Sequence, residues 1–194
     1  MRTKHVVLAA LLLFITTAAS ALTERRVHQT LNLDPTGRFS LNTHNGSITI
    51  NTWNRSSVEI DARIDPGESD HQEDVDAVDV RISGGGSSVR VETNYDKVPY
   101  RSSSWWFGGN NRTLPPVHYT ISVPASAVVD IDDHNATVRV SGLAGDLRVS
   151  SHNGRVDVEN HAGGADITAH NGAVRVEYAR FAKPAAADYS KVPA

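Results

Sequence analysis

The amino-acid sequence predicts an all-β protein whose C-terminal half is a β-solenoid-like stack of two-strand repeats, each 18 residues long. A His-Asn motif followed by alternating apolar residues recurs at His134, His152 and His170, in steps of 152 − 134 = 18 and 170 − 152 = 18. After the N-terminal apolar run, no segment has apolar residues at the 3.6-residue period of an amphipathic helix. An antiparallel β-sandwich or meander is the alternative architecture.

The first 21 residues have the pattern of a secretory signal peptide. Arg2 and Lys4 make the start basic, an apolar run covers residues 6–15, and the small residues Ala19 and Ala21 stand where signal peptidase requires them. An apolar run of about ten residues is too short to span a bilayer core of about 30 Å. We therefore expect cleavage after Ala21 and a periplasmic or secreted protein without a membrane span.

The rest of the chain has the length of one domain. We expect a single β-repeat domain at 22–180, with regular repeats at 127–178, and a C-terminal tail at 181–194. Without Arg2 and Lys4, 17 Lys and Arg stand against 22 Asp and Glu, a formal charge of 17 − 22 = −5. This acidic balance predicts that nucleic acid is not a partner. The chain has no cysteine, so neither disulfides nor a lipid-modified cysteine contribute.

The N-terminal half contains shorter stretches of apolar alternation, at 39–42, 58–60, 78–82 and 89–92, and each predicts a strand. Six acidic residues crowd the segment 65–77. Their spacing matches no EF-hand loop, so we expect a solvated loop there rather than a calcium site.

The repeat keeps its register across the whole unit. Apolar residues recur at equivalent positions: Val129, Leu147 and Ala165; Ile131, Val149 and Ile167; Val138, Val156 and Val174; Val140, Val158 and Val176. Each unit therefore carries two short strands, and the Asn-Gly between them suits the positive φ of a tight turn. Stacking of whole units, about 4.8 Å apart, explains this strict register. Antiparallel hairpins are the alternative, because Asn-Gly is also a hairpin signal.

A family resemblance covers much of the chain. The run Val-His-Tyr-Thr-Ile-Ser-Val-Pro at 117–124 precedes repeated Asn-Gly-x-Val-x-Val units with an intervening Gly-Asp-Leu at 145–147. These residues resemble the bacterial DUF4097 family of adhesin-like proteins with a β-strand repeat, closely over 117–178 and less closely over 27–95. The resemblance implies a β-rich, noncatalytic protein of the cell envelope and brings no catalytic residues. This chain departs from the family in placing His before Asn-Gly and in carrying an aromatic insertion.

The histidines are the first candidate site. If the repeats stack, His134, His152 and His170 form a column, and His44, in a fourth copy of the motif, extends it if that copy stacks on the same edge. Neighbouring imidazoles could then share a divalent metal, with Zn–N bonds of about 2.0–2.1 Å. The alternative is that these side chains only pack on one another, in which case the protein needs no cofactor.

The second candidate is the aromatic loop at 99–116. Trp105, Trp106 and Phe107 stand together in a stretch rich in Gly, Ser and Asn and bounded by prolines, which is typical of a loop. Such aromatic residues could contact a glycan or a protein partner of the envelope. Alternatively, they fold back and cap one end of the stack.

An enzyme is not expected. The sequence has no Gly-x-Ser-x-Gly elbow, His-Glu-x-x-His motif or Walker loop. We therefore predict an exported, noncatalytic, adhesin-like binding or structural module. A metal-binding periplasmic protein is the alternative, and a carbohydrate-active enzyme is the third hypothesis.

Overall fold

A computed structural model describes residues 22–179 except residue 100 and the segments 103–109 and 112–113, with only the backbone given at 101–102 and 110–111. The protein is all-β, as predicted, apart from one short helix. The elements in chain order are β1 (Arg25–Trp53), β2 (Ser57–Ile64), α1 (Gln72–Ala77), β3 (Asp79–Asn94), β4 (Arg101–Ser102), β5 (Asn110–Asn111), β6 (Val117–Pro124), β7 (Val128–Ser141), β8 (Leu147–His161) and β9 (Ala165–Tyr178).

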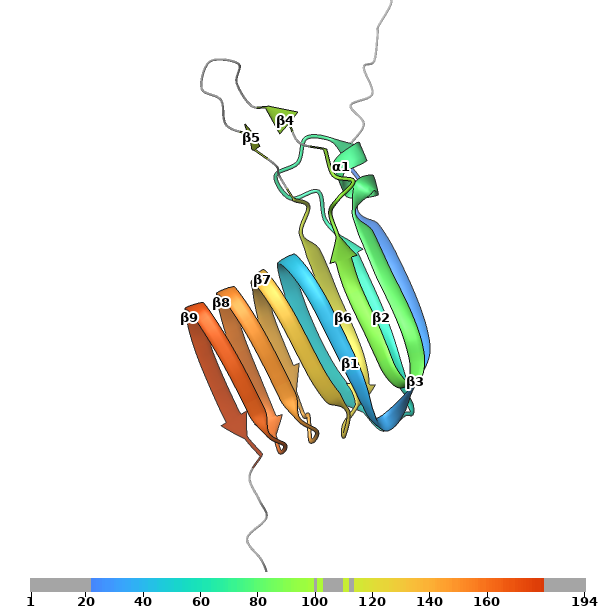
Figure 1. Ribbon diagram of the computed structural model, residues 1–194, viewed down its shortest axis with the longest axis vertical. Coiled ribbons are helices and arrows are strands. Elements are labelled where there is room, and N and C mark those ends of the chain that lie inside the picture. Colours follow the sequence, from blue (N-terminus) through green and yellow to red (C-terminus); the bar gives the residue numbers. More distant parts are fainter. Residues whose placement is uncertain (1–21, 100, 103–109, 112–113, 180–194) are drawn as a thin grey trace, which may run out of the picture.

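The C-terminal half is a stack of parallel strands. Strand β7 pairs with β8 and β8 with β9. Paired residues are 18 positions apart, as in Val138↔Val156 and Val156↔Val174, up to a register shift after Val158. Figure 1 shows each of these strands folding over near its middle. The backbone pairing is interrupted at the His-Asn motif there, which divides each strand into an N-terminal arm and a C-terminal arm. The predicted stacking is therefore confirmed for β7, β8 and β9, and the hairpin alternative is wrong for these three strands because they pair in parallel.

The fourth copy of the motif, in β1, is the neighbour of β7 on the other side. The pairs Phe39↔Val129 and Ile48↔Val138 join segments 129 − 39 = 90 residues apart. Strand β1 is also parallel to β3 and β6, whereas β2 is antiparallel to both β1 and β6. The N-terminal half thus combines both kinds of pairing, and its four predicted strand segments all lie in β1, β2 and β3 apart from Val78, which directly precedes β3.

The core lies between the two arms of the folded strands. Apolar side chains alternate with exposed ones along each arm, and the inward set is buried. Ile131 and Val138 of β7 are both fully buried, as are Phe39 and Ile48 of β1. At about 25 cal/mol per Å² of apolar surface, this burial is the main stabilising term in a chain without disulfides.

The acidic segment 65–77 differs from the predicted solvated loop. It contains α1, whose Asp74 is 3 % exposed and accepts a 2.7 Å hydrogen bond from the Ser69 hydroxyl. Val75 beside it is fully buried. The sequence pattern missed this helix because one and a half turns are too short to show a helical period.

The glycines of the corners are required mainly by close approach. Only Gly46 has a positive φ, of 128°, whereas Gly154 and Gly172 do not. A Cβ on Gly154 would lie 1.9 Å from the carbonyl oxygen of Ala136, and one on Gly172 would lie 1.7 Å from that of Gly154. The positive φ expected from Asn-Gly therefore holds at Gly46 only, and at Gly154 and Gly172 the backbone of the preceding strand leaves no room for a side chain.

Within the described residues, no helix is both long and apolar enough to cross a membrane.

Candidate functional site

The histidine column is present, and it includes the N-terminal copy. The rings of His44, His134, His152 and His170 stack face to face, with centroid separations of 4.7, 4.7 and 5.1 Å and interplanar angles of 7°, 5° and 14°. The column follows directly from the parallel register, which places one imidazole on each successive strand. His44 is half-buried and also meets the edge of the Tyr95 ring, whereas the other three are exposed. His161 lies apart from the column, fully buried, with its Nε2 3.1 Å from the carbonyl oxygen of Gly164.

A column of asparagines runs beside the histidines. The amide of Asn153 donates to the side-chain oxygen of Asn135 at 2.8 Å, and Asn171 donates to Asn153 at 3.1 Å. Asn45 leaves this pattern and donates to the backbone carbonyl of Leu114. Adjacent corners are thus tied by two ladders of side chains, one aromatic and one amide.

An open polar groove of about 350 Å³ borders the column. Its walls are the histidines together with Asn42, Thr43, Asp132, Asp133, Ser150, Ser151 and Thr168. Asp133 is 4 % exposed, and its Oδ1 accepts hydrogen bonds from the Ala136 N–H at 2.8 Å and the Ser151 hydroxyl at 3.2 Å. Its Oδ2 is buried and has no hydrogen-bond partner among the residues that the structure describes. Burial raises the pKa of the Asp133 carboxyl above its usual range.

The face-to-face stacking of the imidazoles is unfavourable for a shared metal ion. Imidazoles stacked face to face direct their nitrogen lone pairs along parallel planes, whereas a shared metal needs lone pairs that converge. In the described part of the chain, no group of three or more His, Cys, Asp or Glu side chains is arranged to hold a metal ion. Metal binding by His134, His152 and His170 would therefore require their rings to rotate.

Charged residues alternate on the outer face of the C-terminal arms. Arg139, Asp157 and Arg175 occupy neighbouring positions on β7, β8 and β9. They line a groove of about 290 Å³. Asp157 accepts from Arg155 at 2.8 Å, so its charge is already balanced within its own strand.

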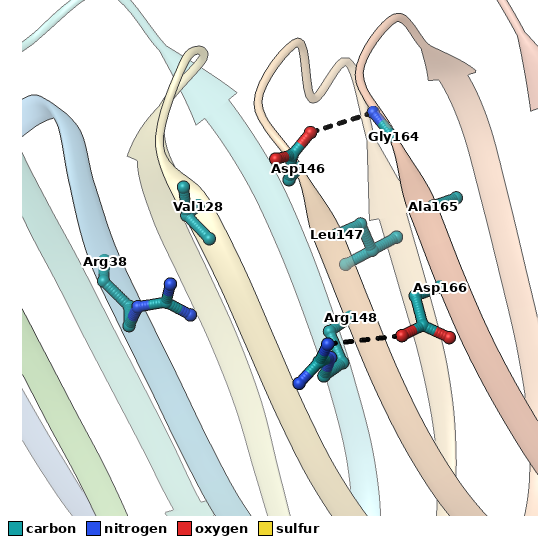
Figure 2. Close-up of a pocket in the computed structure, with 8 residues that line it drawn as sticks. All are labelled: Arg38, Val128, Asp146, Leu147, Arg148, Gly164, Ala165 and Asp166. Carbon is teal, nitrogen blue, oxygen red and sulfur yellow. Dashed lines mark hydrogen bonds and ion pairs between the residues drawn. The ribbon is translucent and has the colours of Figure 1, made fainter.

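A second charged groove lies at the opposite end of the strands, beside the turns that connect them. It has a volume of about 400 Å³. Figure 2 shows Arg148 paired with Asp166 at 3.4 Å, and Asp146 accepting the Gly164 N–H at 3.0 Å. Both contacts join residues 18 positions apart, so they stabilise the stack one repeat at a time and leave few free hydrogen-bonding groups for a ligand.

Sequence reasoning missed one pair that could carry chemistry. The Ser47 hydroxyl lies 2.8 Å from His118 Nδ1, because β1 and β6 run parallel with these two residues side by side. Burial and the neighbouring Arg63 lower the pKa of His118. Acyl transfer also needs N–H donors for an oxyanion, but the backbone around Ser47 is paired with β6 on one side and β7 on the other. Trp105, Trp106 and Phe107 lie outside the described residues.

Neither the family models nor the curated proteins contain a match to this chain. Among solved structures, it is similar to a "putative cell adhesion protein" from Clostridium sporogenes, at 9% identity and a TM-score of 0.43, covering 79% of this chain and 100% of that one. It is also similar to a "putative lipid binding protein" from Parabacteroides distasonis, at 7% identity and a TM-score of 0.31, covering 77% and 59%. A "putative adhesin" from the same organism has 11% identity and a TM-score of 0.26, covering 79% and 68%.

Proposed function

We propose that this chain is a noncatalytic, exported β-solenoid module of the cell envelope, related to the DUF4097 family, that binds an extended glycan. The observation that carries the proposal is the groove of about 350 Å³ along the histidine column. It presents the same exposed side chains once per strand, at His134, His152 and His170. Export rests on the signal pattern at residues 1–21.

The chemistry of the groove favours a glycan. Strands of one sheet lie about 4.8 Å apart, which is close to the length of one sugar ring in an extended polysaccharide. Imidazole, amide, hydroxyl and carboxylate groups in the groove are suited to hydrogen bonding with a hydroxyl-rich ligand. Because the rings of the column stack face to face, the middle imidazoles present their edges, not their faces, to such a ligand. Trp105, Trp106 and Phe107 are proposed, from sequence alone, as a second contact with the same ligand or with an envelope protein.

The test is binding of the chain from Leu22 onward to peptidoglycan and to purified surface polysaccharides. We expect His134→Ala with His152→Ala to weaken binding about tenfold, a loss of about 1.4 kcal/mol. His28→Ala is the matched control, because His28 is an exposed histidine on β1 outside the column. Equal binding by the column variant and the wild type would reject the groove as the site. Release of sugar fragments during the assay would instead indicate an enzyme.

Divalent-metal binding is the second candidate, because the column brings four imidazoles together beside Asp132. Zn²⁺, Cu²⁺ and Ni²⁺ titrations followed by calorimetry test it. Stoichiometric binding that His152→Ala abolishes and His28→Ala preserves would support the metal site. Heat signals no larger than buffer would remove it.

A further inference from the structure

The stack ends at β9 without a covering element among the described residues. Among the residues that the structure describes, β9 pairs with β8 alone, so the other edge of each arm carries backbone N–H and C=O groups that no described strand pairs with. Core positions are uncovered there as well. Val156 of β8 is fully buried, whereas its equivalent Val174 in β9 is 46 % exposed, and Tyr178 is 55 % exposed. An edge of this length with apolar inward positions is a template for pairing with another strand.

We propose that a second copy of this chain covers β9, through antiparallel pairing of the two β9 strands about a twofold axis that passes between His170 and Asn171. The axis exchanges the two arms of the folded strand. The N-terminal arm of one copy then pairs with the C-terminal arm of the other, and each arm pairs once. Both open ends are closed in a single isologous contact.

Charge and burial on β9 fix this register. With the axis between His170 and Asn171, Asp166 lies opposite Arg175 of the second copy, and the same ion pair forms again across the axis. Ile167 lies opposite Val174, so two inward-facing side chains meet in one extended core. Both charged residues are exposed on β9 and stand on its outer face. Within the chain Asp166 lies 3.4 Å from Arg148 and Arg175 lies 3.3 Å from Glu177, so the pair with the second copy adds to these exposed contacts rather than filling a free site.

Other pairing registers of the two β9 strands oppose unfavourable side chains. A shift of one residue would place inward side chains opposite outward ones. A shift of two residues in one direction places Asp166 opposite Glu177, which sets like charges against each other, and in the other direction places it opposite Ala173. Head-to-tail stacking lacks a matching surface, because the far end of the stack contains β3 and the antiparallel β2 rather than a repeat of the same register.

The first test is the oligomeric state of the chain from Leu22 onward, measured by sedimentation equilibrium. We expect a dimer, and we expect Asp166→Arg and Arg175→Asp each to weaken dimerisation by about tenfold or more. The double variant, which carries both changes, restores the pairs with reversed sign and should recover the dimer. Arg139→Asp is the matched control: like Arg175 it neighbours Asp157, but it lies on β7, away from the edge. A monomer at high micromolar concentration overturns the proposal, as does a dimer that none of the β9 variants weakens.

The second test checks the pairing register by disulfide cross-linking. The chain has no cysteine, so introduced cysteines can pair only with each other. Thr168 lies opposite Ala173 of the second copy in the proposed register, and both residues are exposed. The double variant Thr168→Cys with Ala173→Cys should form a disulfide-linked dimer under mild oxidation, because directly opposed Cβ atoms lie about 4.5–5.5 Å apart. Thr168→Cys alone should give little covalent dimer. Efficient cross-linking by this single variant, or none by the double variant of a dimeric protein, overturns the register.

Discussion

Replacing Gly154 with alanine tests the stacking of the corners, and the structure allows the cost to be worked out. The added Cβ would lie 1.9 Å from the Ala136 carbonyl oxygen, whereas ordinary contact begins near 3.4 Å, a shortfall of 3.4 − 1.9 = 1.5 Å. Separating β8 from β7 by that amount at the corner would stretch the Asn153–Asn135 hydrogen bond from 2.8 Å to 2.8 + 1.5 = 4.3 Å. At that distance the hydrogen bond is lost.

The expected destabilisation combines two terms. Overpacking of a tight site costs about 1–3 kcal/mol, and loss of one hydrogen bond costs about 1 kcal/mol. We therefore expect Gly154→Ala to lower the free energy of unfolding by about 2–4 kcal/mol, a large part of the stability of an ordinary domain.

Urea unfolding followed by circular dichroism, at one fixed protein concentration, measures this loss. Gly86→Ala is the control, because Gly86 has a φ of 65° but no atom within 4 Å of the added Cβ. Gly86→Ala should lower the free energy of unfolding by only about 1 kcal/mol, the cost of holding an alanine in the left-handed region. The steric reasoning is refuted if Gly154→Ala costs less than about 1 kcal/mol, or no more than Gly86→Ala.

Three further predictions concern polar groups. The pKa of Asp133 is raised in the folded state, so the contribution of the protonated Asp133 carboxyl to stability is greatest at low pH. It is lost as the pH rises from the unfolded value of 3.8 through the raised value. In urea titrations the wild type should therefore gain stability relative to Asp133→Asn between pH 7 and pH 4, and a constant difference between the two would contradict the burial argument. The lowered pKa of His118 favours its neutral form in the folded state, so NMR should show His118 titrating below the ordinary histidine value of 6.5. Arg63→Gln should move the midpoint upward, and an unchanged midpoint would leave burial as the whole cause. Tyr119→Phe should cost about 1 kcal/mol in thermal and urea unfolding, because the buried Tyr119 hydroxyl loses its 2.6 Å hydrogen bond to Thr93, and an unchanged stability would mean that this bond contributes nothing net.

The sequence predicted the C-terminal stack well because the stack is a local consequence of repetition. Identical apolar positions at an 18-residue step can all be buried only if whole units lie side by side, which is how Val138, Val156 and Val174 are arranged. The histidine column followed from the same register. The column extends to His44 only because β1 lies beside β7, and the repeat pattern could not predict that these two strands are neighbours.

What the sequence missed depends on contacts between distant segments. Nothing in the local pattern shows that β2 turns back against β1, or that Ser47 meets His118 across 71 residues. The buried Asp74 was expected in solvent because its acidic neighbours dominate the local composition. Its Ser69 partner is nearby in sequence, but a six-residue helix leaves no periodic signal.

The position of β1 has a consequence for the order of folding. Strand β1 is made early, yet its partners β6 and β7 begin only at Val117 and Val128, so most of the chain must be present before β1 is paired on both sides. Contacts this far apart in sequence make folding slow, on the order of milliseconds to seconds. A chain that stays unfolded until its last third has been made is well suited to being threaded through a translocation pore before it folds, and the 18-residue units can then be added to β7 one after another.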